Sequence, residues 1–90
     1  MGEVRNVSDS EFNDTVNSTE WVIVDFWAPW CAPCKAIGPV LESVAQEREI
    51  LVAKVDTEQN TSTAAQLGVR SIPALFMYRN GSIVSQKTGS

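Results

Sequence analysis

The chain has 90 residues, of which 43% are hydrophobic and 20% are charged. That composition is typical of globular proteins and excludes intrinsic disorder, and a chain this short forms one hydrophobic core, so residues 1–90 are treated as a single domain. The net charge of -4, with seven basic residues scattered along the sequence, argues against nucleic acid and anionic membrane surfaces as partners.

The N-terminal segment, MGEVRNVSDSEF, has no positively charged stretch that leads into an apolar run. It therefore does not resemble a secretory signal, and the longest apolar stretch of the chain is too short to span a bilayer. We expect a soluble protein of the cytoplasm that makes no membrane contact.

The first predicted helix begins near Ser8, which has capping-box spacing to Glu11, while Val7 and Phe12 occupy the positions of a hydrophobic staple. The next segment, residues 21–27, is rich in β-branched and aromatic residues, and its apolar side chains fall on both faces. This pattern predicts a central strand that is covered on both sides.

A helix is predicted from Pro33 onward, because apolar residues recur there at helical spacing, and Pro39 is expected to kink it. Residues 51–56 predict a second buried strand, and residues 61–67 a short helix that Gly68 terminates. Residues 74–87 predict a β-hairpin that turns at Asn80 and Gly81, a pair that tolerates the positive φ angles of a type I′ turn.

The predicted order of elements is β-α-β-α-β-α-β-β. Alternating strands and helices indicate a parallel sheet layered with helices, and the terminal hairpin adds an antiparallel edge. The fold class is therefore α/β, with a central mixed sheet flanked by helices in three layers.

The only cysteines, Cys31 and Cys34, lie in the stretch WAPWCAPCK. A structural disulfide between them would close a very short loop and restrict the unfolded chain little. A structural zinc site needs four Cys or His ligands, and the sequence has no histidine, although two chains could share an ion. We predict no metal site within one chain.

Redox chemistry is the third interpretation, and it is favoured because a C-x-x-C motif at a strand-to-helix junction is a specific signal. Cys31 follows the central strand and opens a helix, where unpaired amide groups favour the thiolate, which is the attacking species. Cys34 lies one turn further on and deeper, close enough to form a disulfide and suited to resolving a mixed disulfide.

The sequence resembles the thioredoxin family over nearly all of its 90 residues, in VDFWAPWCAPCK, VAKVD, VRSIPALFMYRNGS and Gly89. The resemblance implies a thioredoxin-like sandwich and a protein disulfide reductase with a redox-active Cys31–Cys34 disulfide and no bound cofactor. Its partners would be proteins that contain disulfides and a thioredoxin reductase, which supplies electrons from NADPH.

Asp25 interrupts the central strand and is either a carboxylate that reaches water or a desolvated group with a raised pKa. Lys54, the only charge within LVAKV, either extends to the surface or meets a carboxylate. The resemblance implies that Asp25 and Lys54 lie close together and that Asp25 exchanges a proton with Cys34 through water. We expect Asp25→Asn to slow disulfide reduction more than it changes the equilibrium potential.

Pro73 is compatible with an ordinary strand-start proline. The resemblance implies instead a cis bond from Ile72 to Pro73 that faces the cysteines and offers backbone hydrogen bonds to an extended substrate. Trp27 is expected to pack beside the site. Further substrate-binding residues are expected on its surface: Trp30, Ala32, Pro33 and Gly89.

The sequence departs from the family at two places. Ala32 stands where the usual motif has glycine, which leaves the sign of any shift in redox potential open. The chain also stops at KTGS, where family members normally continue into an amphipathic helix that covers one face of the sheet. We therefore expect an uncovered apolar sheet face, part of which self-association, strand exchange or a partner that supplies the helix would cover.

Two alternatives to the reductase stay open on the sequence. One is an oxidase or isomerase with the same cysteines and a higher potential. The other is a shortened thioredoxin scaffold that acts as a folding fragment or a self-associating binding module with little turnover.

Overall fold

The structure is a computed structural model that describes residues 2–89. Its strands are β1 (Glu3–Asn6), β2 (Trp21–Trp27), β3 (Leu51–Asp56), β4 (Ala74–Arg79) and β5 (Ser82–Thr88). Its helices are the 3-10 turn η1 (Asp9–Glu11), α1 (Phe12–Val16), α2 (Ala32–Ala36), α3 (Gly38–Arg48) and α4 (Ser62–Gln66). The predicted order of strands and helices is confirmed, including the first strand, for which the sequence pattern had predicted no bounds.

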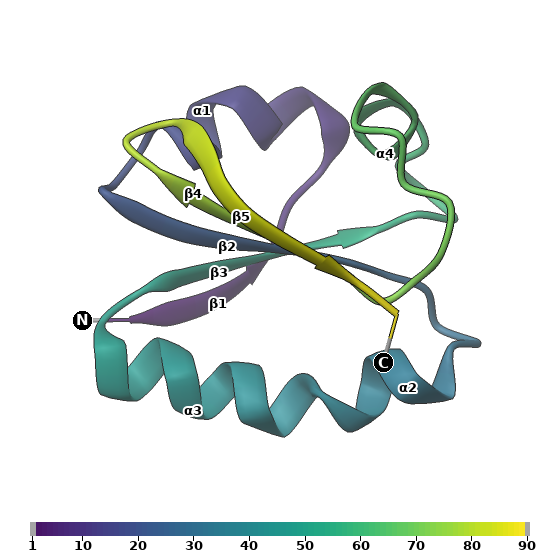
Figure 1. Cartoon of the computed structure of the whole chain (residues 1–90), viewed down its shortest axis with the longest axis horizontal. Coiled ribbons are helices and arrows are strands. Elements are labelled where there is room, and N and C mark those ends of the chain that lie inside the picture. The colour runs from purple at the N-terminus through teal and green to yellow at the C-terminus, as the bar shows by residue number, and fades with distance from the viewer. Residues whose placement is uncertain (1, 90) are drawn as a thin grey trace.

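The strands form one five-stranded sheet in the order β1-β3-β2-β4-β5. The pairs β1–β3 and β3–β2 are parallel, whereas β2–β4 and β4–β5 are antiparallel. Figure 1 shows α1 and α4 above this sheet and α2 and α3 below it. The mixed three-layer α/β fold is therefore confirmed, with β2 at its centre.

The entry into the first helical segment follows the predicted capping pattern. The Ser8 N–H donates to the Glu11 Oε1 at 3.0 Å, which satisfies one of the amide groups that a helix start leaves unpaired. Val7 and Phe12 are both buried in the same hydrophobic cluster, as a hydrophobic staple requires. This contact fixes the direction in which the chain leaves β1.

The helix that follows the cysteines is divided at Ile37, which separates α2 from α3. Pro39 lies in the first turn of α3, where its missing N–H costs little, but it has no donor with which to continue the hydrogen bonds of α2. The predicted kink is therefore a break between a short helix that carries the site and a longer helix that covers the sheet.

The hairpin turns at Asn80 and Gly81, whose φ angles are 51° and 83°. Positive φ at both central positions matches the twist of the flanking strands, as the sequence predicts. A shift in register between Met77 and Tyr78, opposite β5, is a β-bulge that the sequence pattern did not reveal.

Alternate residues of β2 belong to two hydrophobic clusters, one on each face of the sheet. Val22, Val24 and Phe26 lie in the cluster beneath α1 and α4, whereas Ile23 lies in the cluster under α3. Because β2 is covered on both faces, the side chains of residues 22–26 are almost completely removed from water, and that includes the carboxylate of Asp25.

The α3 face of the sheet carries an open groove of about 500 Å3. We call it the α3 groove, and it is lined by Trp21, Val44, Arg48, Ile50 and Met77. No helix follows β5 within residues 2–89. Among the same residues, no helix has both the length and the apolar character that a membrane crossing requires.

Candidate active site

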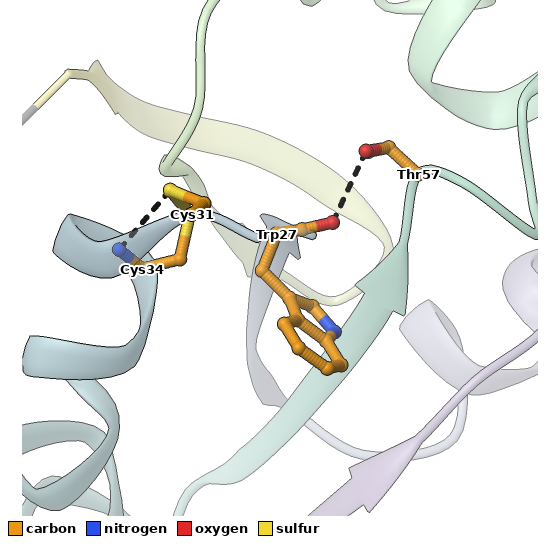
Figure 2. The surroundings of a disulfide bond; sticks show 4 residues. All are labelled: Trp27, Cys31, Cys34 and Thr57. Atoms are coloured by element: carbon orange, nitrogen blue, oxygen red, sulfur yellow. Dashed lines mark hydrogen bonds between the residues drawn. A yellow bond between two sulfur atoms is a disulfide. The ribbon is translucent and has the colours of Figure 1, made fainter. Parts of the chain in front are cut away.

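The cysteine pair lies where β2 ends and α2 begins. Cys31 is the N-cap residue of α2, with extended backbone angles, and it forms a disulfide with Cys34, at a Cα–Cα distance of 5.3 Å. Figure 2 shows this disulfide beside Trp27. A residue pair three apart can be bridged here because the turn from strand to helix brings both Cβ atoms onto one side.

The backbone of α2 interacts directly with the Cys31 sulfur. The Cys34 N–H donates to the Cys31 Sγ at 3.2 Å, which is the contact that a side-chain cap makes at a helix start. In the reduced protein a thiolate at this sulfur gains from the same amide group, so the geometry favours ionisation of Cys31. Cys31 and Cys34 are 4% and 2% exposed, so the expected difference in depth is small in the disulfide form.

Trp27 joins the cysteine pair to the end of the sheet. Its side chain packs against the buried cluster of Ala28, Cys31 and Cys34, which confirms its expected position beside the site. Its carbonyl oxygen accepts hydrogen bonds from Thr57, at 2.9 Å from the backbone N–H and at 3.1 Å from Oγ1. The last residue of β2 is therefore held at both its backbone and its ring.

Asp25 lies on β2 opposite Lys54 of β3, in adjacent parallel strands. Burial raises the pKa of Asp25 from 3.8 to about 6, and the positive charge of Lys54 opposes this rise. Both carboxylate oxygens are buried without a hydrogen-bond partner among residues 2–89. Lys54 is partly buried and places its ammonium nitrogen 4.7 Å from the centre of the Trp27 ring.

The bond between Ile72 and Pro73 is cis. Ile72 packs against the cluster that contains both cysteines, so this loop lies beside the disulfide although about forty residues separate the two in sequence. The Gly89 N–H donates to the Pro73 carbonyl oxygen at 2.8 Å, which brings the end of the described chain to the same loop.

Three residues of the cysteine loop are open to solvent. Trp30 is 68% exposed, and Ala32 and Pro33 are exposed in the first turn of α2. An exposed tryptophan beside a buried disulfide offers a broad apolar surface next to the reacting atoms.

The sequence did not single out Thr57 or Ala28, although both contact the site residues. Ala28 is completely buried, and its carbonyl oxygen accepts the N–H of Cys31 at 3.1 Å. Alanine after a buried strand carries no sequence signal. Thr57 carries a weak one, because a polar residue directly after a buried strand lies near the carboxyl ends of the neighbouring strands.

The chemistry available to this arrangement is dithiol–disulfide exchange, which needs a pair of close cysteines, a stabilised thiolate and an accessible surface beside them. The class of protein that the fold and the cysteine pair define is a thiol–disulfide oxidoreductase.

Comparisons with known proteins give the family. The family model described as Thioredoxin matches residues 3–90. The thioredoxin of Haemophilus influenzae is 43% identical over 93 aligned positions, which cover 100% of this chain and 87% of the relative. The thioredoxin of Synechocystis is 41% identical with the same coverage.

Solved structures agree with this match. A mutant thioredoxin from Halobacterium salinarum superimposes with a TM-score of 0.91 at 34% identity, over 97% of this chain and 78% of the other. The thioredoxin of Malassezia sympodialis gives a TM-score of 0.85 at 31% identity, over 99% of this chain and 81% of the other. The chain belongs to the thioredoxin family.

Thioredoxins reduce protein disulfides through a cysteine pair and need no bound cofactor. The chain is accordingly a protein disulfide reductase that works by dithiol–disulfide exchange, and Cys31 and Cys34 are its redox group. None of these findings favours the alternative of a folding fragment or binding module.

Proposed function

We propose that Cys31 is the attacking residue and Cys34 the resolving residue of this reductase. The observation that carries the assignment is the hydrogen bond from the Cys34 N–H to the Cys31 sulfur, because it stabilises a thiolate on Cys31. The Cys31 thiolate attacks one sulfur of a substrate disulfide and releases the other as a thiolate. The Cys34 thiolate then attacks the Cys31 sulfur, releases the second substrate thiolate and restores the Cys31–Cys34 disulfide.

Insulin reduction with single variants tests this assignment. Cys31→Ser is expected to abolish turnover, whereas Cys34→Ser is expected to accumulate a covalent mixed disulfide with the substrate, seen on a non-reducing gel. A mixed disulfide that forms with Cys31→Ser and not with Cys34→Ser would reverse the two roles.

Asp25 is proposed as the group that accepts the proton of Cys34 and later returns it. Its raised pKa of about 6 places it within reach of neutral pH, where a carboxyl group exchanges protons most effectively. Lys54 is proposed to assist by its charge, which favours the ionised carboxylate. The chain has no histidine that could take this role.

The substrate is proposed to bind as an extended segment along the loop at Ile72 and Pro73. Support comes from the contact of Ile72 with the cysteine cluster and from the exposed surface of the cysteine loop. Backbone hydrogen bonds hold the segment in the manner of an added strand. The residues proposed to flank it are Trp30, Ala32, Pro33 and Gly89.

Regeneration of the dithiol is proposed to come from a thioredoxin reductase that uses NADPH, which would return two electrons to the Cys31–Cys34 disulfide per cycle. Because such a cycle requires a reducing compartment, we place the protein in the cytoplasm.

Self-association through the uncovered sheet face is proposed as well. The α3 groove is lined mainly by apolar side chains, and every residue of the edge strand β5 is exposed, including Ile83 and Val84 at 42% and 55%. Exposed apolar surface beside an unpaired strand edge favours pairing with a second chain.

A further inference from the structure

Thr57 follows directly on β3 and contacts the last residue of β2. The register of the two strands ends with Trp27 opposite Asp56, and beyond this pair the Thr57 N–H donates to the Trp27 carbonyl oxygen at 2.9 Å. The Thr57 hydroxyl donates to the same oxygen at 3.1 Å (Figure 2). The backbone bond alone continues the pairing of β2 with the chain after β3, so the hydroxyl is a second donor on an acceptor with two lone pairs.

The oxygen that receives both bonds is close to the reacting cysteine along the chain. After Trp27 the backbone passes through the completely buried Ala28, whose carbonyl accepts the Cys31 N–H at 3.1 Å. The position of the Trp27 carbonyl therefore sets where the loop to Cys31 begins. Because the surroundings are closely packed, a displacement of the Trp27 carbonyl would be transmitted to this loop.

The Trp27 ring also contacts the segment that contains β3. It packs against the cysteine cluster on one side, and the Lys54 ammonium lies 4.7 Å from its centre. The segment formed by β3 and Thr57 thus holds Trp27 by its carbonyl and by its ring.

We propose that Thr57 is a positioning residue of the reductase, whose hydroxyl fixes the Trp27 carbonyl and, through it, the Trp27 ring and the loop that presents Cys31. Thr57 touches neither sulfur and takes no part in proton transfer. The inference rests on the proposed attack by Cys31.

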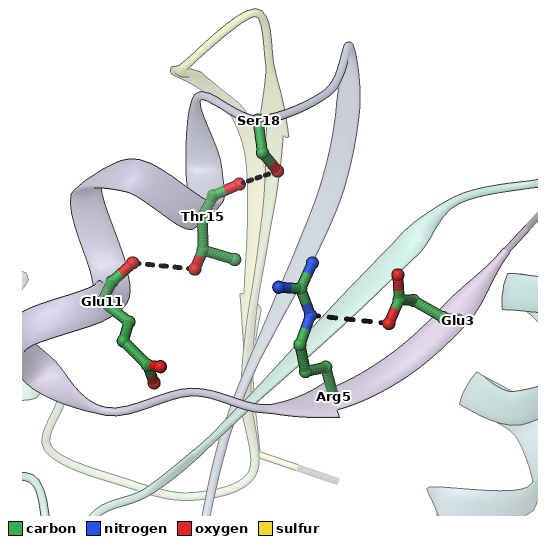
Figure 3. A network of polar contacts seen from close by, with 5 residues as sticks. All are labelled: Glu3, Arg5, Glu11, Thr15 and Ser18. Carbon is green, nitrogen blue, oxygen red and sulfur yellow. Dashed lines mark hydrogen bonds and ion pairs between the residues drawn. The ribbon is translucent and has the colours of Figure 1, made fainter.

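A purely structural hydroxyl offers the matched control. The Thr15 Oγ1 donates to the Glu11 carbonyl oxygen at 2.7 Å within the first helical segment (Figure 3). That bond is also a partly buried bond from a threonine hydroxyl to a backbone carbonyl, and it lies in α1, on the face of the sheet opposite α2. Thr15→Val and Thr57→Val therefore both remove a threonine hydroxyl that donates to a backbone carbonyl oxygen, and Thr15→Val does so away from the site.

The test measures alkylation of reduced Cys31 by iodoacetamide across pH, and the equilibrium constant of the Cys31–Cys34 pair with glutathione. Thr57→Val is expected to lower the alkylation rate about fivefold and to shift both the midpoint of its pH profile and the glutathione equilibrium, because one hydrogen bond is lost. Thr57→Ser, which keeps the hydroxyl, is expected to react within about twofold of the native protein. Thr15→Val is expected to react at the native rate.

Two results would overturn the proposal. One is a Thr57→Val protein with the native rate, pH midpoint and glutathione equilibrium. The other is a Thr57→Ser protein as slow as Thr57→Val, which would exclude the hydroxyl as the cause. If Thr57→Val does not fold, Thr57→Ala replaces it against Thr57→Ser, since these two differ only in the hydroxyl.

Neither measurement uses a protein substrate or a reductase, so both report on Thr57 separately from the proposed function. A native protein whose Cys31 is alkylated rapidly but which fails to reduce insulin would contradict the proposed function and leave the Thr57 test valid.

Discussion

The carboxylate of Asp25 is removed from water at the centre of the sheet, and its oxygens have no hydrogen-bond partner among residues 2–89. Desolvation penalises the charged form, while Lys54 opposes it, and the resulting pKa of about 6 leaves a mixture of protonated and ionised Asp25 near neutral pH. An ionised carboxylate in this position makes the folded state less stable, a cost for which the proposed proton exchange with Cys34 would account.

The first prediction concerns stability. Because folding raises the Asp25 pKa from 3.8 to about 6, the contribution of Asp25 to stability is present below pH 3.8 and is lost as the pH rises through about 6. Asp25→Asn, which cannot ionise, is therefore expected to be more stable than the native protein at pH 7.5, by up to about 3 kcal/mol. Near pH 3.5 the two are expected to unfold at the same urea concentration, and a constant difference across this range would contradict the raised pKa.

The second prediction concerns rate. Above pH 6 the Asp25 carboxylate of the native protein is available to take the Cys34 proton. The rate at which the native protein reduces insulin is therefore expected to rise with pH, with a midpoint near 6. Asp25→Asn is expected to lose this midpoint and to reduce insulin about tenfold more slowly at pH 7, with little change in equilibrium potential. Pre-steady-state kinetics across pH would measure this, and an unchanged pH profile would remove Asp25 from the mechanism.

At the scale of elements, Asp9 joins η1 to the start of α4. Its carboxylate oxygens accept the N–H groups of Ser62 and Thr63, each at 3.0 Å, and its own N–H donates to the Asn60 Oδ1 at 3.0 Å. Partial burial by itself raises the pKa of Asp9, but the hydrogen bonds from Thr63 and Ser62 outweigh it and lower that pKa below its ordinary value. These hydrogen bonds hold η1 against the start of α4, although the two segments lie about fifty residues apart in sequence.

The third prediction follows from this cap. Asp9→Ala is expected to lower the free energy of unfolding by about 1 kcal/mol at pH 7, because the first amide groups of α4 lose their acceptor. The loss is expected to fade as the pH falls below about 4 through the lowered pKa of Asp9, where the native carboxylate is itself protonated. Asp14→Ala, at an exposed position of α1, is the control in urea titrations, and an equal loss there would show that the cap is unimportant.

Local patterns predicted most element boundaries because they act within a few residues. The turn at Asn80 and Gly81 and the cap at Ser8 depend on backbone angles and hydrogen bonds between near neighbours. The bulge at Met77 and Tyr78 escaped prediction because it depends on the register between two strands, which no local pattern specifies. The cap that Asp9 forms at the start of α4 was not predicted for a similar reason, since its partners Ser62 and Thr63 lie far away in the sequence.

At the scale of the whole molecule, the two faces of the sheet are covered unequally. Three segments, η1, α1 and α4, lie over one cluster of large apolar side chains, whereas α3 leaves the α3 groove open beside Met77. Arg48 lines the same groove, so its wall is apolar with a positive charge at the helix end. A second chain that covers this groove removes apolar surface from water.

The fourth prediction tests this association by sedimentation velocity. The native protein is expected to show an apparent mass that rises with concentration, and Val44→Lys is expected to remain monomeric, because a second positive charge then replaces an apolar side chain in the groove, beside that of Arg48. Gln46→Lys adds the same charge at an exposed position of α3 and is expected to behave as the native protein does. A native protein that is monomeric at every concentration would exclude association through this groove.

The sequence by itself determined the reaction class, because a C-x-x-C motif between a buried strand and a helix start is encoded within a dozen residues. It also determined the order of the strands and helices, since propensity and periodicity act locally. The resemblance to the thioredoxin family implied two features around the cysteines, Asp25 close to Lys54 and Ile72 beside the disulfide, and the tertiary structure shows both. Only the tertiary structure decided the third, the hydrogen bonds from Thr57 to the Trp27 carbonyl oxygen. These groups lie about thirty to forty residues apart in sequence, and they meet because the sheet brings the carboxyl ends of the parallel strands β2 and β3 and the amino end of the antiparallel strand β4 to one edge.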